Sequence, residues 1–171
     1  MLGGFDRPAP YGGSYENRTK IYFECVKAAA SEIGNGILAA RVNLFDGEAG
    51  KWGVGENQSL ALDEPLRLVR DLAAMNVTLI NITMGTPYFN PHVNRPYARG
   101  GYEQPENPID GVARLLYGCK RAQAEVPDVV CVATGMSYLR QFGPAIAAGL
   151  VEEGGAKCVG WGRGAFAYPD F

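Results

Sequence analysis

Four short apolar segments recur along the chain, and they are the pattern from which its secondary structure is predicted. They are rich in β-branched residues, and their apolar positions are nearly continuous instead of alternating with polar ones. Parallel strands that are covered on both faces have this pattern. The four predicted strands span Gly36–Leu44, Val77–Thr83, Val129–Thr134 and Ala156–Gly160.

Stretches with apolar residues at helical spacing precede or separate these strands. Ser and Asp are favourable N-cap residues, and glycine commonly ends a helix. The predicted helices run from Ser14, as N-cap, to Ile33 before Gly34 and Gly36; from Asp63, as N-cap, through apolar positions between Leu66 and Ala73; across Ile109, Val112, Leu116 and Cys119, which share one face; and from about Leu139 to Leu150.

The alternation of helices and strands predicts an α/β domain with a parallel sheet over residues 1–171. Four strands are half of an eight-stranded TIM (βα)₈ barrel, or a small open doubly wound sheet. The sequence begins with a loop and a helix, and it closes at Tyr168-Pro-Asp-Phe171 with no helix to cover the last strand. We therefore expect both ends to be truncated.

The amino-acid composition and the net charge argue against some classes of function. The hydrophobic share of 47% and the charged share of 20% are ordinary for a globular domain, whereas 23 glycines are about double the usual share. A net charge of −2 without a basic stripe argues against a nucleic-acid or membrane surface. No signal peptide or membrane span is indicated, so we expect a cytoplasmic protein.

The cysteines form no close pair and no pattern with histidine, so no metal site is predicted. Each stands in an apolar segment, which predicts buried free thiols. They are Cys25, Cys119, Cys131 and Cys158.

His92, the only histidine, belongs to a long segment after the second predicted strand. No acid or nucleophile is visibly paired with it, so we expect a solvated loop histidine. The segment from Gly85 to Pro108 also carries four aromatic residues. Loops of this length at the rim of a barrel are often functional, and this one is expected to cover the substrate side of a ligand or to pack against another part of a barrel.

Arg41 stands in the middle of an apolar strand. A buried arginine requires an anionic or hydrogen-bonding partner. A structural salt bridge is one interpretation of this position. The other is a guanidinium that holds an electron-rich ligand.

Glycines follow the third and fourth predicted strands, in Thr134-Gly135-Met136 and in Gly160-Trp161-Gly162-Arg163. In eight-stranded barrels, the loops after the last two strands often form a phosphate site. Glycine lets backbone N–H groups approach phosphate oxygens, and arginine adds a bidentate contact. The two segments together predict such a site.

Four motifs occur in order: Tyr11-Gly-Gly-Ser-Tyr-Glu-Asn-Arg18, Ala40-Arg41-Val-Asn43, Thr134-Gly135-Met136, and Val159-Gly-Trp-Gly162-Arg163 with Ala167-Tyr-Pro-Asp-Phe171. With this order and spacing, the chain resembles the Old Yellow Enzyme family of NADH:flavin oxidoreductases. The first motif looks like the family's YGGSxENR signature, and the last like its closing segment.

The resemblance implies the C-terminal half of an FMN-binding barrel, with strands five to eight. It implies an oxidoreductase that uses NADH or NADPH to reduce an activated alkene or a similar small-molecule substrate. Arg41 would contact the flavin pyrimidine edge, and the phosphate end would be held by Gly135, Met136, Trp161, Gly162 and Arg163.

The family's substrate-binding histidine pair and tyrosine proton donor have no counterpart in this sequence, so no catalytic residue is assigned and the segment alone is expected to be inactive. Its expected partner is the N-terminal half of the barrel or a self-associating copy. Two other functions are kept as alternatives: a non-catalytic half-barrel assembly subunit, and a small open-sheet nucleotide-binding module.

Overall fold

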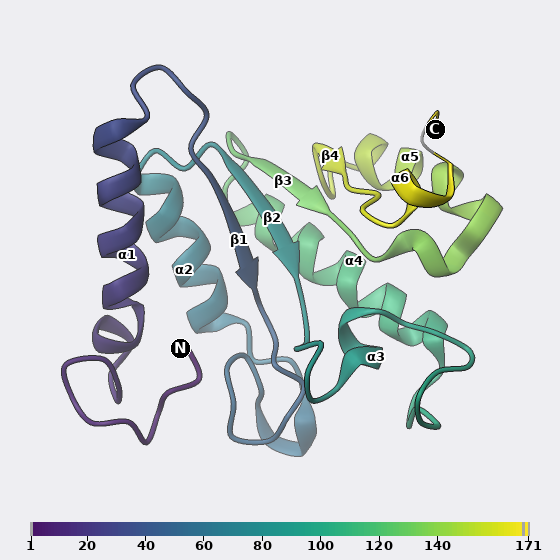
Figure 1. Cartoon of the computed structure of the whole chain (residues 1–171), viewed down its shortest axis with the longest axis horizontal. Helices are drawn as coiled ribbons and strands as arrows, with labels where there is room; N and C mark the ends of the chain where they lie inside the picture. The colour runs from purple at the N-terminus through teal and green to yellow at the C-terminus, as the bar shows by residue number, and fades with distance from the viewer. Residues whose placement is uncertain (1, 169, 171) are drawn as a thin grey trace.

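The computed structural model describes residues 2–168 and 170, and in this part of the chain four strands form one parallel sheet in the order β1-β2-β3-β4 (Figure 1). The α/β class and the parallel sheet are therefore confirmed. The spatial order follows the sequence without the reversal that a doubly wound sheet contains.

Each strand ends up shorter than its apolar segment, because the flanking residues continue as connections to the helices. The strands are β1 (Ala39–Asn43), β2 (Leu79–Thr83), β3 (Val130–Ala133) and β4 (Cys158–Val159). The helices are α1 (Tyr15–Glu32), α2 (Asp63–Ala74), α3 (Pro91–Asn94), α4 (Pro108–Glu125), α5 (Gly143–Glu152) and α6 (Gly164–Ala167), with the 3-10 helices η1 (Glu56–Gln58) and η2 (Met136–Phe142).

One face of the sheet is packed against α2 and α4, which lie behind the strands in Figure 1. Alternate strand residues point to this face and are fully buried, among them Val42, Ile80 and Cys131. They join a core with Leu72 of α2 and Cys119 of α4, both without exposed surface. Burial of the apolar surface of these side chains is the main favourable contribution to the packing of the helices on the sheet.

The other face of the sheet is only partly covered. Arg41, Asn81 and Val132 stand side by side across β1, β2 and β3 in the parallel register. Arg41 is exposed, and the other two are partly exposed. The two faces therefore differ sharply, and the strands β1 and β4 are the edges of the sheet.

The first helix begins where it was predicted to. The Ser14 hydroxyl oxygen accepts a hydrogen bond from the backbone N–H of Asn17 at 3.3 Å, which confirms the N-cap. Helix α1 ends at Glu32, and Gly34 adopts the left-handed conformation. The predicted cap of the second helix is wrong: the N-cap is Leu62, and Asp63 lies in the first turn, where its charge suits the helix dipole.

Two further details of the helices differ from the prediction. Ile109 is 51% exposed, because the buried face of α4 instead follows Val112, Leu115 and Cys119. The last predicted helix begins later, since the segment before Gly143 is the 3-10 helix η2.

The prediction of four buried thiols is half right. Cys119 and Cys131 are buried, and burial raises their pKa values to about 12 and about 11. Cys25 and Cys158 are exposed, since Cys25 lies on an outer face of α1 and Cys158 on the edge strand. All four are free.

The longest helices, α1 and α4, carry charged residues throughout. Among the helices in residues 2–168 and 170, none is long and apolar enough to cross a membrane.

Candidate functional site

A hollow of about 560 Å³ lies where the carboxyl ends of β3 and β4 meet the uncovered face of the sheet. Five of the six residues assigned from the sequence border it: Arg41, Gly135, Trp161, Gly162 and Arg163. They come from the edge strand β1, from the turn after β3 and from the segment after β4. The parallel topology brings them together, because all carboxyl ends of parallel strands point the same way.

Gly135 shapes the floor of this hollow through its backbone. Its φ of 101° lies in the left-handed region, which glycine adopts without strain. A Cβ there would also come within 2.5 Å of Leu115 Cδ1. Gly135 therefore turns the chain sharply from β3 into η2. The residues of this turn, Thr134, Gly135 and Ser137, line the hollow.

The segment after β4 closes the opposite side. The backbone N–H of Gly160 donates to the carbonyl of Ala133 at 2.8 Å and continues the pairing of β3 with β4. Trp161 then packs its ring against Gly143, where a Cβ would lie 2.4 Å from the indole Cη2. Around an ideal Cβ at Gly162, by contrast, the described residues leave open space. This glycine can therefore let a ligand approach the backbone closely.

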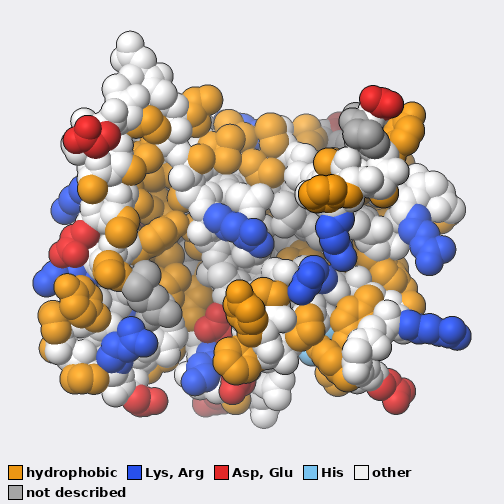
Figure 2. All heavy atoms as spheres, in the orientation of Figure 1, with side chains coloured by type: hydrophobic (Ala, Val, Ile, Leu, Met, Phe, Trp, Pro, Cys, Tyr) orange, Lys and Arg blue, Asp and Glu red, His pale blue; other side chains and the backbone are white. Residues whose placement is uncertain are grey.

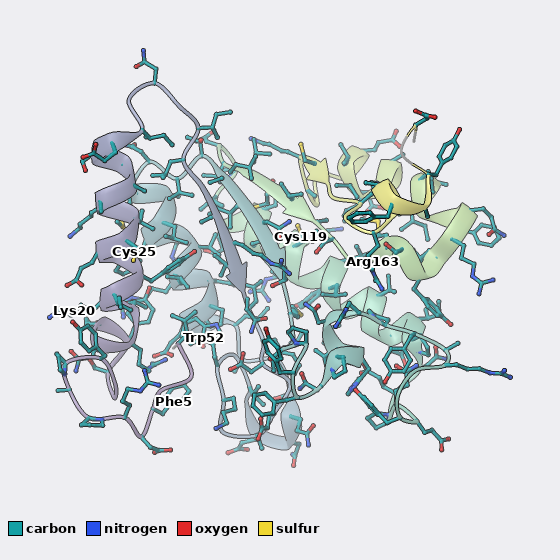
Figure 3. All side chains as sticks on the ribbon, in the orientation of Figure 1. Phe5, Lys20, Cys25, Trp52, Cys119 and Arg163 are labelled. Atoms are coloured by element: carbon teal, nitrogen blue, oxygen red, sulfur yellow. The ribbon has the colours of Figure 1, made fainter. Side chains whose placement is uncertain are left out.

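Arg163 extends from the start of the yellow C-terminal segment, close to the end of β3 (Figure 3). It is exposed and borders the hollow together with Arg41. Both guanidinium groups are available to an anionic ligand, because neither forms an ion pair with any carboxylate in the described part of the chain.

Arg41 is not buried, which corrects the sequence-based prediction. Its neighbours in the strand suggested an apolar environment on both faces, but only the face that carries Val42 is covered. Arg41 shares its face with Asn81, its partner in register on β2. The salt bridge considered from the sequence is not formed within residues 2–168 and 170. The backbone carbonyl of Arg41 accepts a hydrogen bond from Tyr22 Oη at 3.2 Å.

Met136 is the one assigned residue that does not border the hollow. It is 1% exposed and belongs to the hydrophobic core, while Ser137 and Thr134 line the hollow beside it.

Sequence reasoning missed several lining residues, namely Asn81, Asn94, Arg95 and Ser137. Asn81 could have been found as a polar residue within an apolar strand. Asn94 and Arg95 come from α3 and the loop after it, and they reach the hollow through tertiary structure. Asn94 is held by a hydrogen bond from its side-chain amide to the carbonyl of Met84 at 3.0 Å.

The prediction of a solvated His92 is wrong. Its side chain is only 12% exposed, and its Nδ1 lies 2.5 Å from Tyr102 Oη. Its Nε2 lies 4.0 Å from a carboxylate oxygen of Glu106, which forms a bidentate pair with Arg114. Burial lowers the pKa of His92 against the opposing effect of Glu106, and Arg114 lowers it further. His92 therefore holds the long loop together.

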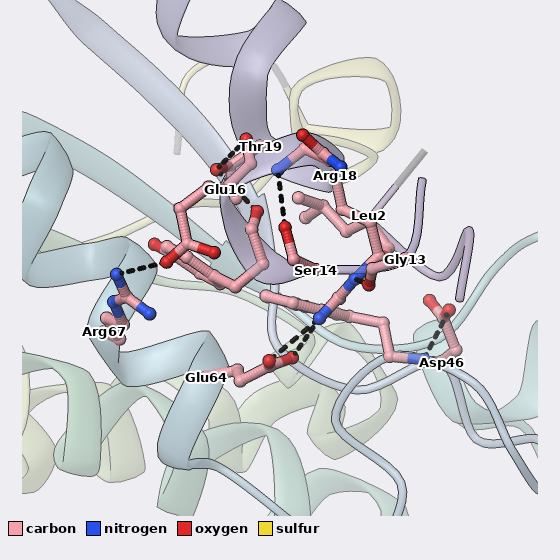
Figure 4. Close-up of polar contacts among 12 residues, drawn as sticks. Leu2, Gly13, Ser14, Glu16, Arg18, Thr19, Asp46, Glu64 and Arg67 are labelled. Atoms are coloured by element: carbon pink, nitrogen blue, oxygen red, sulfur yellow. Dashed lines mark hydrogen bonds and ion pairs between the residues drawn. The ribbon is translucent and has the colours of Figure 1, made fainter. Parts of the chain in front are cut away.

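The first motif also has a structural role in this chain. Arg18 is 2% exposed, and its Nη2 donates to both carboxylate oxygens of Glu64 at 2.7 and 2.8 Å (Figure 4). Its other nitrogens donate to the carbonyls of Gly13 and Leu2 at 2.8 and 2.7 Å. The guanidinium also lies 4.1 Å from the ring centroid of Phe5. Arg18 thus joins the N-terminal loop, α1 and α2.

Part of the closing motif, Pro169 and Phe171, lies outside the described residues. Comparison of the whole chain with protein-family models gives no match, and neither does comparison with curated proteins.

Proposed function

We propose that this chain is the C-terminal half of an FMN-binding (βα)₈ barrel from an NAD(P)H-dependent oxidoreductase that resembles the Old Yellow Enzyme family. The observation that carries the proposal is the hollow bordered by Arg41, Gly135, Gly162 and Arg163. Its volume of about 560 Å³ is within the range of cofactor sites.

The residues present fit the two polar ends of FMN. The turn at Gly135 and the open backbone at Gly162 can present N–H groups to a phosphate, and Arg163 adds charge next to them. Arg41 would hold the pyrimidine edge of the ring and stabilise negative charge there when the flavin is reduced. Bound flavin would supply the hydride transfer from NADH or NADPH to an activated alkene or similar acceptor.

The barrel assignment is supported by the asymmetry of the sheet. Consecutive parallel strands with helices on one face are the repeating unit of a barrel wall. The uncovered face carries partly exposed apolar residues, among them Leu79, Val130 and Val132. In a closed barrel these side chains would be packed inside. We therefore propose that a complementary N-terminal half, or a second copy of this chain, covers this face.

The test compares FMN with riboflavin, which has the same ring but no phosphate. Each is titrated into the purified chain and followed by flavin fluorescence and visible absorbance. FMN should bind more tightly than riboflavin but modestly, because one wall of the ring site is absent. Arg163→Gln should remove the difference, whereas Arg41→Met should weaken binding of both. Equal affinities for FMN and riboflavin, or no binding of either, would contradict the proposal.

Light scattering on the same samples tests the partner. The uncovered face and the two sheet edges should cause dimerisation or aggregation of the chain alone. A stable yellow monomer that reduces activated alkenes with NADH or NADPH would contradict the half-barrel assignment.

A further inference from the structure

A second hollow, of about 470 Å³, lies beside the first and is bordered by a largely different set of side chains. The loop after α3 supplies Tyr97 and Arg99, and η2 supplies Ser137, Tyr138 and Arg140. Ser137 and Arg163 border both hollows. Most of the side chains around the second hollow, Tyr97, Arg99, Tyr138 and Arg140 among them, do not border the first.

The charge around this hollow is of one sign. Arg99, Arg140 and Arg163 border it, Arg95 borders the two hollows next to it, and none of the three linings contains an Asp or Glu. In residues 2–168 and 170, these four arginines form no ion pair. On the right of Figure 2, several basic side chains (blue) accordingly lie close together, and acidic side chains (red) lie only at the margins of this region.

Several arginines elsewhere on the chain do form ion pairs. Arg67, Arg70 and Arg114 each pair with a carboxylate at 2.6–2.9 Å. Like charges that gather without counter-charges repel one another, and an anion placed between them relieves the repulsion. The cluster is thus suited to bind a ligand with more than one negative charge.

The backbone of Arg140 points to the same conclusion. Its φ of 50° and ψ of −127° interrupt η2 in a region that residues other than glycine rarely adopt. Such strain persists only where the surrounding structure enforces it, and it concentrates at binding segments. The side chain of Arg140 lines the hollow together with Arg99.

We propose that this second hollow is an anion subsite that binds the phosphate group of a ligand other than the flavin. A phosphate dianion can accept charge-assisted hydrogen bonds from Arg99 and Arg140 at once, and the Ser137 hydroxyl can donate another. Tyr97 and Tyr138 provide aromatic surface beside the charge, which suits a nucleotide phosphate better than free phosphate. The subsite does not depend on flavin binding.

The test uses the full chain, with calorimetric titrations at fixed ionic strength. The probes are inorganic phosphate and adenosine 2′,5′-bisphosphate, each added with and without saturating FMN. Arg99→Gln and Arg140→Gln should each raise the Kd of the probe roughly tenfold and leave FMN binding unchanged. Arg121→Gln is the matched control, because this exposed arginine lies on α4 and donates to Tyr117 Oη instead. It should leave both affinities unchanged.

A second variant separates charge from folding. Arg140→Gly introduces a residue that tolerates positive φ, so it should stabilise the fold while still weakening probe binding roughly tenfold. Tighter binding of the nucleotide than of inorganic phosphate would identify a nucleotide as the source of the group, and equal binding would identify free phosphate. Both results support the subsite.

Unchanged probe affinity in all three variants of Arg99 and Arg140 would overturn the inference. So would competition between FMN and the probe with the same dependence on these arginines, because the two hollows would then be one site. Failure of FMN to bind while the probe binds through Arg99 and Arg140 would count against the proposed function and not against this subsite.

Discussion

Arg18 donates from a single nitrogen, Nη2, to both carboxylate oxygens of Glu64, and only the arginine of this ion pair is buried, with side-chain exposures of 2% and 42%. The arginine also satisfies two backbone carbonyls of the N-terminal loop. Loss of the guanidinium would therefore remove the donor of three part-buried hydrogen-bonding interactions at once, which is more costly than loss of a surface pair.

We expect Arg18→Gln to lower the free energy of unfolding by about 3 kcal/mol. The matched control is Arg70→Gln, which removes an exposed pair with Glu125 and should change stability by at most about 0.5 kcal/mol. Urea denaturation followed by far-UV circular dichroism measures both. Equal effects of the two substitutions would show that burial of Arg18 contributes nothing.

The two glycines of the hollow proposed to bind FMN should respond differently to alanine. Gly135→Ala introduces a side chain at φ 101° and should destabilise the fold by about 1–3 kcal/mol. Gly162→Ala places its methyl group in open space and should leave stability unchanged, yet weaken FMN roughly tenfold by blocking approach to the backbone. Thermal unfolding and FMN titration on the same samples measure the two effects. A Gly162→Ala protein with normal FMN affinity would remove this residue from the proposed site.

Thiol reactivity should divide the cysteines into two pairs. Cys25 and Cys158 are exposed and should react with a disulfide reagent in the native protein at pH 8. Cys119 and Cys131 are buried with pKa values raised to about 12 and about 11, so they should react only after unfolding. The count should rise from two to four thiols in denaturant. Four fast thiols in the native chain would mean that the core between α4 and β3 opens readily.

The single histidine offers a clean pH experiment. Burial lowers the pKa of His92 below its ordinary value of about 6.5, so the folded chain binds fewer protons than the unfolded chain in the interval just below that value. The free energy of unfolding should therefore decrease as pH falls through this interval. Proton NMR of the imidazole follows the pKa directly.

Substitution of the neighbours should shift this pKa in opposite directions. Glu106→Gln removes the negative charge that raises the pKa of His92, so the pKa should fall further. Arg114→Gln removes the positive charge that lowers it, so the pKa should rise. Shifts of the same sign in both variants would show that the loop rearranges.

The parts of this fold that follow from local chemistry could be predicted from sequence. The four apolar segments form the four parallel strands, and Ser14 caps α1. Both features depend on residues that are close together in the sequence. The exposure of Arg41 could not be predicted, since it depends on which face of the sheet is covered. Ile109 and Cys158 were misplaced for the same reason: burial is decided by tertiary packing.

The candidate site divides in the same way. Gly135, Gly162 and Arg163 were identified because each stands directly after an apolar strand. Arg99 and Arg140 carry no such signal, and they line one hollow only because the loop after α3 and η2 come together in the tertiary structure.

The shortness of β4 has a thermodynamic consequence. Only two residues pair with β3, and the segment from Gly160 to Arg163 that borders both hollows continues directly from them. Amide exchange should be fastest at this margin of the sheet, where local opening breaks few hydrogen bonds. A ligand that binds only the closed form stabilises it by about 2.7 kcal/mol at a concentration one hundred times its Kd. A ligand bound in either hollow should therefore slow amide exchange in β4, because opening of this short strand would also release the ligand.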